Sequence, residues 1–143
     1  MNRVKLLNQS KVKDSISLWV KNLSIRISSI ESPIQTLSGG NQQRVVLAKW
    51  ISTQPRVLIL DGPTTGIDIV AKHAIHEIIR KLARQGIAII LISDEISEVY
   101  NNCNHILVMR KGIIVHELDA SHVSQEEIQN YVNATNSTEK RIL

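Results

Sequence analysis

The sequence is poor in aromatic residues and in cysteine. Its 143 residues include no Phe, and aromatic residues make up only 3%. The stacking platforms of single-strand and RNA binders are therefore missing. The single cysteine, Cys103, cannot form an internal disulfide and fits a reducing compartment. Because no Cys-His spacing typical of metal sites surrounds it, we interpret Cys103 as an inert packing or surface residue.

Long apolar runs are also missing. Those present are short, such as IAIILI at 87–92, so the sequence predicts no segment that spans a bilayer. The first fifteen residues lack the apolar core and the small-residue cleavage site of a secretory signal, which favours a cytoplasmic location. Hydrophobic residues make up 43% and charged residues 21%, as is typical of one modest globular domain.

The charge balance is mildly basic, with a formal net charge of +4 and a pI near 9.4. Such a balance suits an anionic partner, nucleic acid included. The basic residues are dispersed, however, and aromatics are scarce. We therefore expect a solvated surface and no nucleic-acid partner, and a nucleic-acid binder stays as an alternative that rests on the pI alone.

The first third of the chain is predicted to be helical after a poorly ordered lead over residues 1–15. Apolar residues recur at three- or four-residue intervals from Ile16 to Ile27, which predicts a short amphipathic helix. A connector with Pro33 follows. The next helix should begin near Gly39 or Asn41 and end before residue 53, where a proline two residues later disfavours continuation.

The middle of the chain has the pattern of a strand-helix-strand unit. VLILD at 57–61 is a predicted strand, and residues 69–84 form a predicted helix that Gln85-Gly86 closes. The wholly apolar segment IAIILIS, at 87–93, is typical of a strand buried on both faces in a parallel sheet. Such a unit is expected to be a right-handed crossover.

The last third predicts smaller elements. A short helix lies in EISEVYNNC, and a hairpin turns at Lys111-Gly112. A closing helix begins at Ser124 with Glu127 in the capping-box position, and a frayed tail is expected over 135–143.

Two segments carry the pattern of phosphate chemistry. In LSGGNQQ, at 37–43, a serine and two glycines at a helix start expose N–H groups at the positive end of the helix dipole, with no side chain to block an anion. An ordinary N-cap with flexible glycines is the alternative. About twenty residues later, Asp61 ends a strand as a single carboxylate of the kind that serves a metal.

Together with PRVLILDGPTTGID and AIILISDEISEV, the segment LSGGNQQRVVLAKW resembles the ATPases of ABC transporters. The similarity is greatest to the second nucleotide-binding half of bacterial carbohydrate importers of the ribose, galactose and autoinducer type. It implies an α/β fold: the C-terminal portion of a P-loop NTPase, with part of the helical subdomain and no Walker A strand and loop. Residues 16–53 would form the helical subdomain and signature helix, and residues 54–134 the Walker B strand, D-loop and C-terminal α/β part.

The resemblance also implies roles for single residues. Asp61 would be the Walker B aspartate, which holds Mg²⁺ mainly through water. Asp68 would be the D-loop residue that communicates across an ATPase dimer, although it is also placed to cap the helix that begins at Ile69. The signature residues that contact the γ-phosphate of ATP on an opposite domain would be Ser38, Gly39, Gly40 and Gln42.

Three departures from the family pattern affect catalysis. Gly62 stands where the family has the glutamate that positions the attacking water, so general-base assistance of about 10²- to 10⁴-fold is missing. Asp94 stands at the switch position, where a carboxylate would repel a γ-phosphate unless it turns outward or is neutralised. The sequence also contains no GxxxxGK[ST] motif, so no primary phosphate cradle is predicted.

The missing motif has a structural consequence, because its strand would lie beside residues 57–61. That strand is expected to have an unpaired hydrophobic edge. We expect the chain to be a truncated remnant of a longer ATPase, and the sequence leaves open whether it arises from an internal start or a disrupted gene.

Two other groups of ionisable residues are interpreted without a catalytic or metal-binding role. His73 and His76 are spaced like metal ligands on one helix, but no third ligand is evident, so we interpret them as solvated. Glu95 and Glu98 are interpreted as acids at a helix N-terminus rather than as an acid-base pair.

The functional hypothesis is an ATP-binding component of an ABC-type sugar importer, which couples ATP hydrolysis to carbohydrate uptake, in a chain that is catalytically impaired. Its cofactors would be ATP and Mg²⁺, and its partners a second ABC ATPase domain and membrane permease subunits at the inner face of the plasma membrane. The alternative is a non-catalytic interaction module that presents LSGGNQQ to an intact ATPase. The residues leave open whether this chain is itself an enzyme, and they do not identify the sugar.

Overall fold

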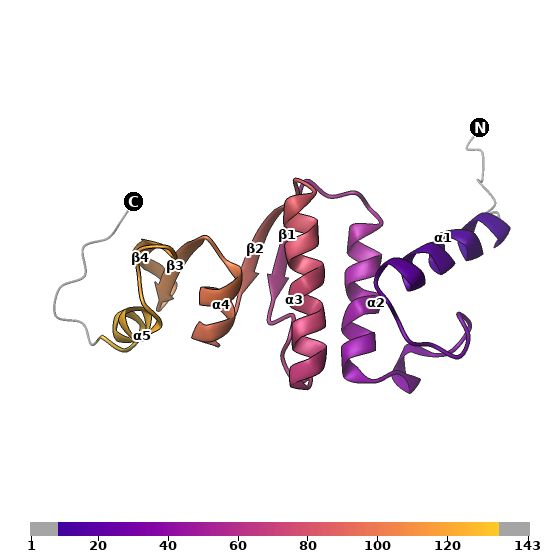
Figure 1. Cartoon of the computed structure of the whole chain (residues 1–143), viewed down its shortest axis with the longest axis horizontal. Coiled ribbons are helices and arrows are strands. Elements are labelled where there is room, and N and C mark those ends of the chain that lie inside the picture. Colours follow the sequence, from indigo (N-terminus) through magenta and orange to yellow (C-terminus); the bar gives the residue numbers. More distant parts are fainter. Residues whose placement is uncertain (1–8, 135–143) are drawn as a thin grey trace. The chain divides into compact units, whose positions relative to one another are not determined.

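The computed structural model describes residues 9–134, which belong to two compact units (Figure 1). Of these residues, 9–58 and 63–88 belong to the first unit, and 59–62 and 89–134 belong to the second. No helix in residues 9–134 combines the length and the apolar character needed to cross a membrane.

The first unit begins with helix α1 (Gln9–Asn22), whose bounds differ from the prediction. The helix starts earlier because Val12, four residues before Ile16, extends the apolar stripe, so residues 9–15 are not an irregular lead. It ends before residue 27 because Ser24 takes a φ of 50° and Arg44 Nη1 donates to the Ser24 carbonyl at 2.6 Å. Residues 1–8 of the expected lead lie outside the described residues.

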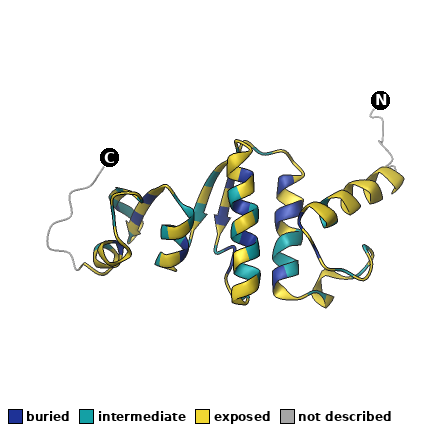
Figure 2. Cartoon of the chain, in the orientation of Figure 1, coloured by how far each residue is buried: buried dark blue, intermediate teal, exposed yellow. Residues whose placement is uncertain are grey.

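A short 3₁₀ helix, η1 (Ile34–Thr36), leads into α2 (Gly39–Ile51), and α3 (Ile69–Arg84) lies beside α2 (Figure 1). The predicted bounds of both long helices are confirmed. Gly86, with a φ of 91°, closes α3 as predicted. Buried positions, dark blue in Figure 2, recur along both helices. The buried aliphatic residues are Leu47, Ala48 and Ile51 in α2, and Ile75, Ile79 and Leu82 in α3.

The N-terminal ends of α2 and α3 approach unusually closely. A Cβ atom on Gly40 would lie 2.6 Å from the Cβ of Ala71, and one on Gly39 would lie 3.2 Å from Cγ2 of Ile67. The first distance is too short for any pair of carbon atoms that are not bonded. Helix α2 therefore needs glycine at position 40 for packing, independently of any ligand.

Strands β1 (Val57–Asp61) and β2 (Ala88–Ile92) form a two-stranded sheet. Ala88 N–H donates to the Arg56 carbonyl at 3.0 Å at one end, and Gly62 N–H donates to the Ile92 carbonyl at 2.9 Å at the other, so the strands run parallel. In residues 9–134 each strand has a single neighbour, so β1 keeps the free hydrophobic edge that was predicted.

The prediction that β2 is buried on both faces is wrong. Ile90 and Ile92 are 51% and 47% exposed, and every second residue of the strand faces solvent. An apolar sequence shows what a strand is able to bury, whereas its actual burial depends on which elements cover the sheet. Within the described residues, one face of β2 stays open.

The second unit contains helix α4 (Ile96–Asn102), strands β3 (His105–Arg110) and β4 (Ile113–Asp119), and helix α5 (Gln125–Asn133). The predicted hairpin is confirmed, with antiparallel β3 and β4. Its turn residues Lys111 and Gly112 have φ values of 47° and 77°, as the tight turns that suit twisted hairpins require. Its buried apolar side chains include Ile106, Val108, Val115 and Ile128.

The capping box predicted for α5 is confirmed in full. Glu127 N–H donates to Ser124 Oγ at 3.2 Å, while Ser124 N–H and Oγ–H both donate to Glu127 Oε2, at 2.7 and 2.8 Å. These donors favour the ionised carboxylate, so the backbone N–H of Ser124, followed by its hydroxyl, lowers the pKa of Glu127. The expected tail over 135–143 lies outside the described residues.

We expect the cap of α5 to weaken in acid. Because the folded-state pKa of Glu127 is lowered, the stability that its carboxylate contributes is present above the unfolded-state pKa and is lost as the pH falls through the folded-state pKa. By NMR, the Glu127 carboxyl carbon should titrate at lower pH in the folded chain than in urea, and Ser124→Ala should reduce the difference. Equal midpoints in the folded and unfolded chains would contradict the assignment.

We also expect Gly40→Ala to destabilise the first unit by about 1–3 kcal/mol, because the added methyl group overpacks the contact with Ala71. Urea unfolding measures the change. Ala71→Gly should offset it in the double variant, beyond the cost of glycine in a helix, and Gly39→Ala should cost less because the end of the Ile67 side chain can move. If the double variant loses as much free energy of unfolding as Gly40→Ala and Ala71→Gly lose in sum, the two residues are not in contact.

Candidate functional site

The LSGGNQQ segment places a hydroxyl group and two backbone donors at the start of α2. Ser38 occupies the N-cap position, where its carbonyl accepts the N–H groups of Asn41 and Gln42, each at 2.9 Å. The N–H groups of Gly39 and Gly40, the first two helical residues, have no acceptor within the helix. This is the arrangement that suits an anion at the positive end of a helix.

The alternative, in which LSGGNQQ is an ordinary N-cap with flexible glycines, is wrong about the Ser38 side chain. Ser38 makes no side-chain cap hydrogen bond, and its exposed Oγ accepts instead from Asn41 Nδ2 at 3.0 Å. The alternative also treated the glycines as flexible, whereas Gly40 is buried against Ala71. The segment is therefore a shaped loop whose serine hydroxyl does not cap the helix.

Two amide side chains support this loop. Gln42, which was predicted to contact ATP, donates from Nε2 to the Leu37 carbonyl at 2.8 Å and so closes the loop from within. Its contact with ATP stays a prediction. Asn41 was not among the predicted site residues, yet it bonds Ser38 and also accepts the Arg26 N–H at Oδ1, at 2.9 Å. The available signal was an amide three residues after a serine, which is the spacing of a capping box.

The predicted D-loop, residues 65–68, lies against the LSGGNQQ segment in the same unit. A Cβ atom on Gly39 would meet Ile67, and Gly66 has a φ of 73°, which favours glycine. Asp68 Oδ1 accepts the Ala71 N–H at 2.9 Å, so its predicted alternative role as the N-cap of α3 is confirmed. Its role across a dimer stays a prediction.

The residues predicted for catalysis lie in the second unit, at the ends of the parallel strands. Asp61 is exposed at the end of β1, and the next residue, Gly62, is bonded to the end of β2 through Ile92. Asp94 is exposed two residues after β2. This edge therefore carries two carboxylates and, at Gly62, a φ of 53°.

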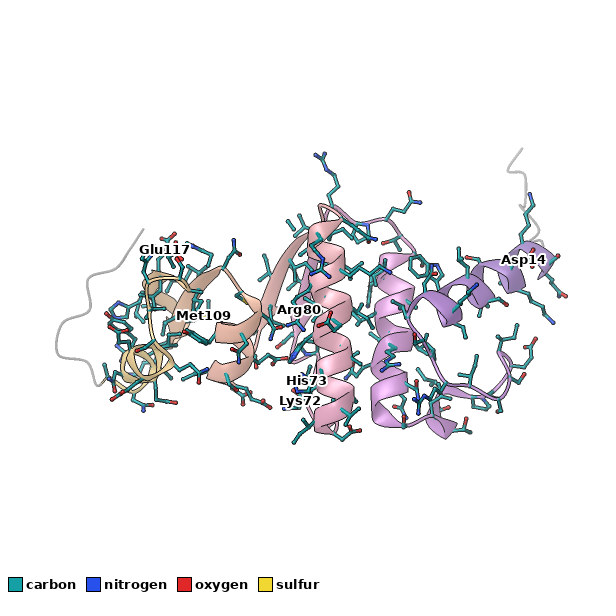
Figure 3. All side chains as sticks on the ribbon, viewed as in Figure 1. Asp14, Lys72, His73, Arg80, Met109 and Glu117 are labelled. Atoms are coloured by element: carbon teal, nitrogen blue, oxygen red, sulfur yellow. The ribbon has the colours of Figure 1, made fainter. Side chains whose placement is uncertain are left out.

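The side chains at this edge do not form a metal centre by themselves. Within residues 9–134, no three His, Cys, Asp or Glu residues are grouped so as to hold a metal ion. His73 is exposed near the start of α3, next to Lys72 (Figure 3). Asp61 provides one accessible carboxylate, which fits the way in which Mg²⁺ binds proteins, through one or two carboxylates together with water and substrate phosphates.

Three other residues interpreted from the sequence, Cys103, Glu95 and Glu98, lie outside these candidate sites. Burial, followed by the charge of Glu98, raises the pKa of the Cys103 thiol, so the thiol stays protonated and unreactive near neutral pH. Glu98 is in the first turn of α4, as predicted, and Glu95 is its N-cap residue. Glu98 is nevertheless only 5% exposed, which its position in the helix did not indicate.

Comparison with known proteins supports the family that the motifs resemble. Residues 2–65 match the family model described as ABC transporter. The ribose import ATP-binding protein of Oceanobacillus iheyensis is 44% identical over 127 residues, which are 89% of this chain and 26% of that protein. The protein of the same name from Rhodococcus jostii is 49% identical over 110 residues, 77% of this chain and 22% of that protein. The chain thus spans about a quarter of the length of these relatives.

Solved structures show the same fold at lower identity. The ATP-binding cassette MJ0796, in a dimeric post-hydrolysis state bound to ADP and Pi, superposes with a TM-score of 0.69 at 20% identity, over 83% of this chain and 51% of that one. The cassette MJ1267 gives a TM-score of 0.72 at 23% identity, over 89% of this chain and 48% of that one. By its motifs, its sequence relatives and its fold, the chain belongs to the ABC transporter ATPases, and it corresponds to part of their nucleotide-binding cassette.

Proposed function

We propose that the chain acts in an ABC-type sugar importer, where its LSGGNQQ segment contacts the terminal phosphate of ATP held by a second ATPase domain. The observation that carries this proposal is the start of α2, where the Ser38 hydroxyl makes no cap hydrogen bond and the N–H groups of Gly39 and Gly40 have no acceptor within the helix. Such donors provide charge-assisted hydrogen bonds to phosphate oxygens.

The relatives named for ribose import suggest a pentose or a related sugar as the transported substrate. In this proposal the chain does not touch the sugar. It would lie at the inner face of the plasma membrane, where permease subunits carry the sugar and the second ATPase domain supplies the phosphate-binding loop that these 143 residues do not contain. Asp61 would hold Mg²⁺ through water.

In this proposal, hydrolysis at the site that contains Asp61 is impaired. No carboxylate extends from position 62 to orient a water molecule, which removes about 10²- to 10⁴-fold of assistance. Asp94, at the same end of the sheet, adds negative charge where a phosphate would have to approach. The chain would therefore contribute recognition of ATP to its partner more than turnover.

A second candidate is a non-catalytic module that presents the LSGGNQQ face to an intact ATPase and modulates it. The left-handed backbone of Gly62 favours this alternative, because it is adapted to glycine rather than to the missing glutamate. The effect on the partner distinguishes the two candidates. A component of the importer should stimulate turnover by the partner ATPase, and a modulator should lower it.

We expect the chain to associate with an intact sugar-importer ATPase only when ATP is present. The measurement is biolayer interferometry with a partner whose catalytic glutamate is replaced by glutamine, with and without ATP. Ser38→Arg should abolish the association by filling the phosphate position. Ser97→Arg, the same change at an exposed serine of α4, should leave it intact. Association that is absent, or equal without ATP, would reject the proposal.

For the isolated chain, we expect no phosphate release from ATP, and we expect Gly62→Glu to restore none. The glutamate would have to adopt the left-handed backbone of Gly62, at a cost of about 1–2 kcal/mol. Urea unfolding should therefore show that Gly62→Glu and Gly62→Ala are both less stable than Gly62→Asn, since asparagine tolerates this backbone. Turnover by the unmodified chain would overturn the assignment of Gly62.

A further inference from the structure

We propose that Asn41 is a positioning residue that makes the Ser38 hydroxyl a hydrogen-bond donor toward phosphate. This inference rests on the proposed function of the LSGGNQQ segment. It adds to that function a positioning residue, Asn41, and the direction of the hydrogen bond that Ser38 makes. The Asn41 side chain spans two groups: its Oδ1 accepts the backbone N–H of Arg26 at 2.9 Å, and its Nδ2 donates to Ser38 Oγ at 3.0 Å.

The Arg26 contact determines which way round the Asn41 amide lies. A backbone N–H is a donor only, so the atom facing it has to be the amide oxygen. The amide nitrogen must then face Ser38. The assignment of oxygen and nitrogen, which is often ambiguous for asparagine, therefore follows from the main chain here.

The orientation of the amide determines what the Ser38 hydroxyl can do. An amide NH₂ group has no lone pair to offer, so Ser38 Oγ has to accept, and its own proton cannot point toward Asn41. Because the hydroxyl does not cap the helix and Ser38 is exposed, this proton is available to a ligand that approaches from solvent. A phosphate oxygen, which only accepts, is the matching group.

Another helix of the same chain shows the opposite arrangement. Ser124 begins α5 as Ser38 begins α2, and Glu127 lies three residues later, as Asn41 does. There the hydroxyl of Ser124 donates to the Glu127 carboxylate at 2.8 Å, so its proton is consumed within the protein. An acid at the third helical position accepts the proton of the serine hydroxyl, whereas an amide donor at that position leaves the proton available to another acceptor.

The anchor of Asn41 is itself held firmly. Leu23 and Ile25, which precede Arg26, are each only 7% exposed, and Arg44 of α2 donates to the Ser24 carbonyl at 2.6 Å. The Arg26 N–H is therefore presented from a packed segment. A hydroxyl that is oriented before the ligand arrives loses less entropy on binding.

The test is Asn41→Asp, measured in the ATP-dependent association described above. Aspartate keeps the shape and can still accept the Arg26 N–H, but it can only accept from Ser38, which reverses the contact. We expect association to weaken about tenfold or more, the effect of losing a hydrogen bond to a charged group. The variant should keep its fold, because an acid in the first turn suits the helix dipole, whereas a purely structural role of Asn41 would appear as a loss of stability in urea unfolding.

The Ser38→Ala background shows whether Asn41→Asp acts by reversing the hydrogen bond to the Ser38 hydroxyl or by adding a negative charge near the phosphate. If Asn41 acts through the hydroxyl, Asn41→Asp should have little further effect in the Ser38→Ala background. An equal loss in both backgrounds would indicate simple repulsion between the aspartate and the phosphate, and would overturn the inference. Unchanged association of Asn41→Asp would overturn it while leaving the proposed function intact. Failure of the unmodified chain to associate would overturn both.

Discussion

The close contact between Gly40 and Ala71 is the constraint on which the first unit depends. It lets the N-terminal ends of α2 and α3 meet, and both helices carry buried aliphatic side chains farther along their length. The same approach brings Gly39 beside Ile67 and hence the LSGGNQQ segment beside the D-loop. Packing thus requires glycine at position 40, and under the proposed function the same glycines also leave room for an anion.

The proposed function divides between two places in this chain. The start of α2 has an exposed serine hydroxyl, supporting amides and packed neighbours. The end of β1 has Asp61 followed by a glycine, and a second carboxylate, Asp94, follows β2 at the same end of the sheet. This contrast is the basis of the proposal that the chain contributes recognition of ATP to a partner rather than turnover.

Local chemistry explains what could be predicted from the sequence. The capping box at Ser124, the turn at Lys111-Gly112 and the bounds of α3 depend on residues close in the chain, and all three are confirmed. The site residues came from motif resemblance rather than from geometry. The Asn41 contact was missed because its anchor lies fifteen residues away, and the exposure of β2 because periodicity does not show what covers a strand.

The backbone of Gly62 limits which residues this position can hold. With a φ of 53° and its N–H bonded to the Ile92 carbonyl, the residue has a conformation that penalises most side chains, glutamate included. A glutamate introduced here would either strain the loop that follows β1 or break its hydrogen bond to the end of β2. Under the proposed function, a water-positioning acid at this place would therefore need a differently shaped loop, which a single substitution does not supply.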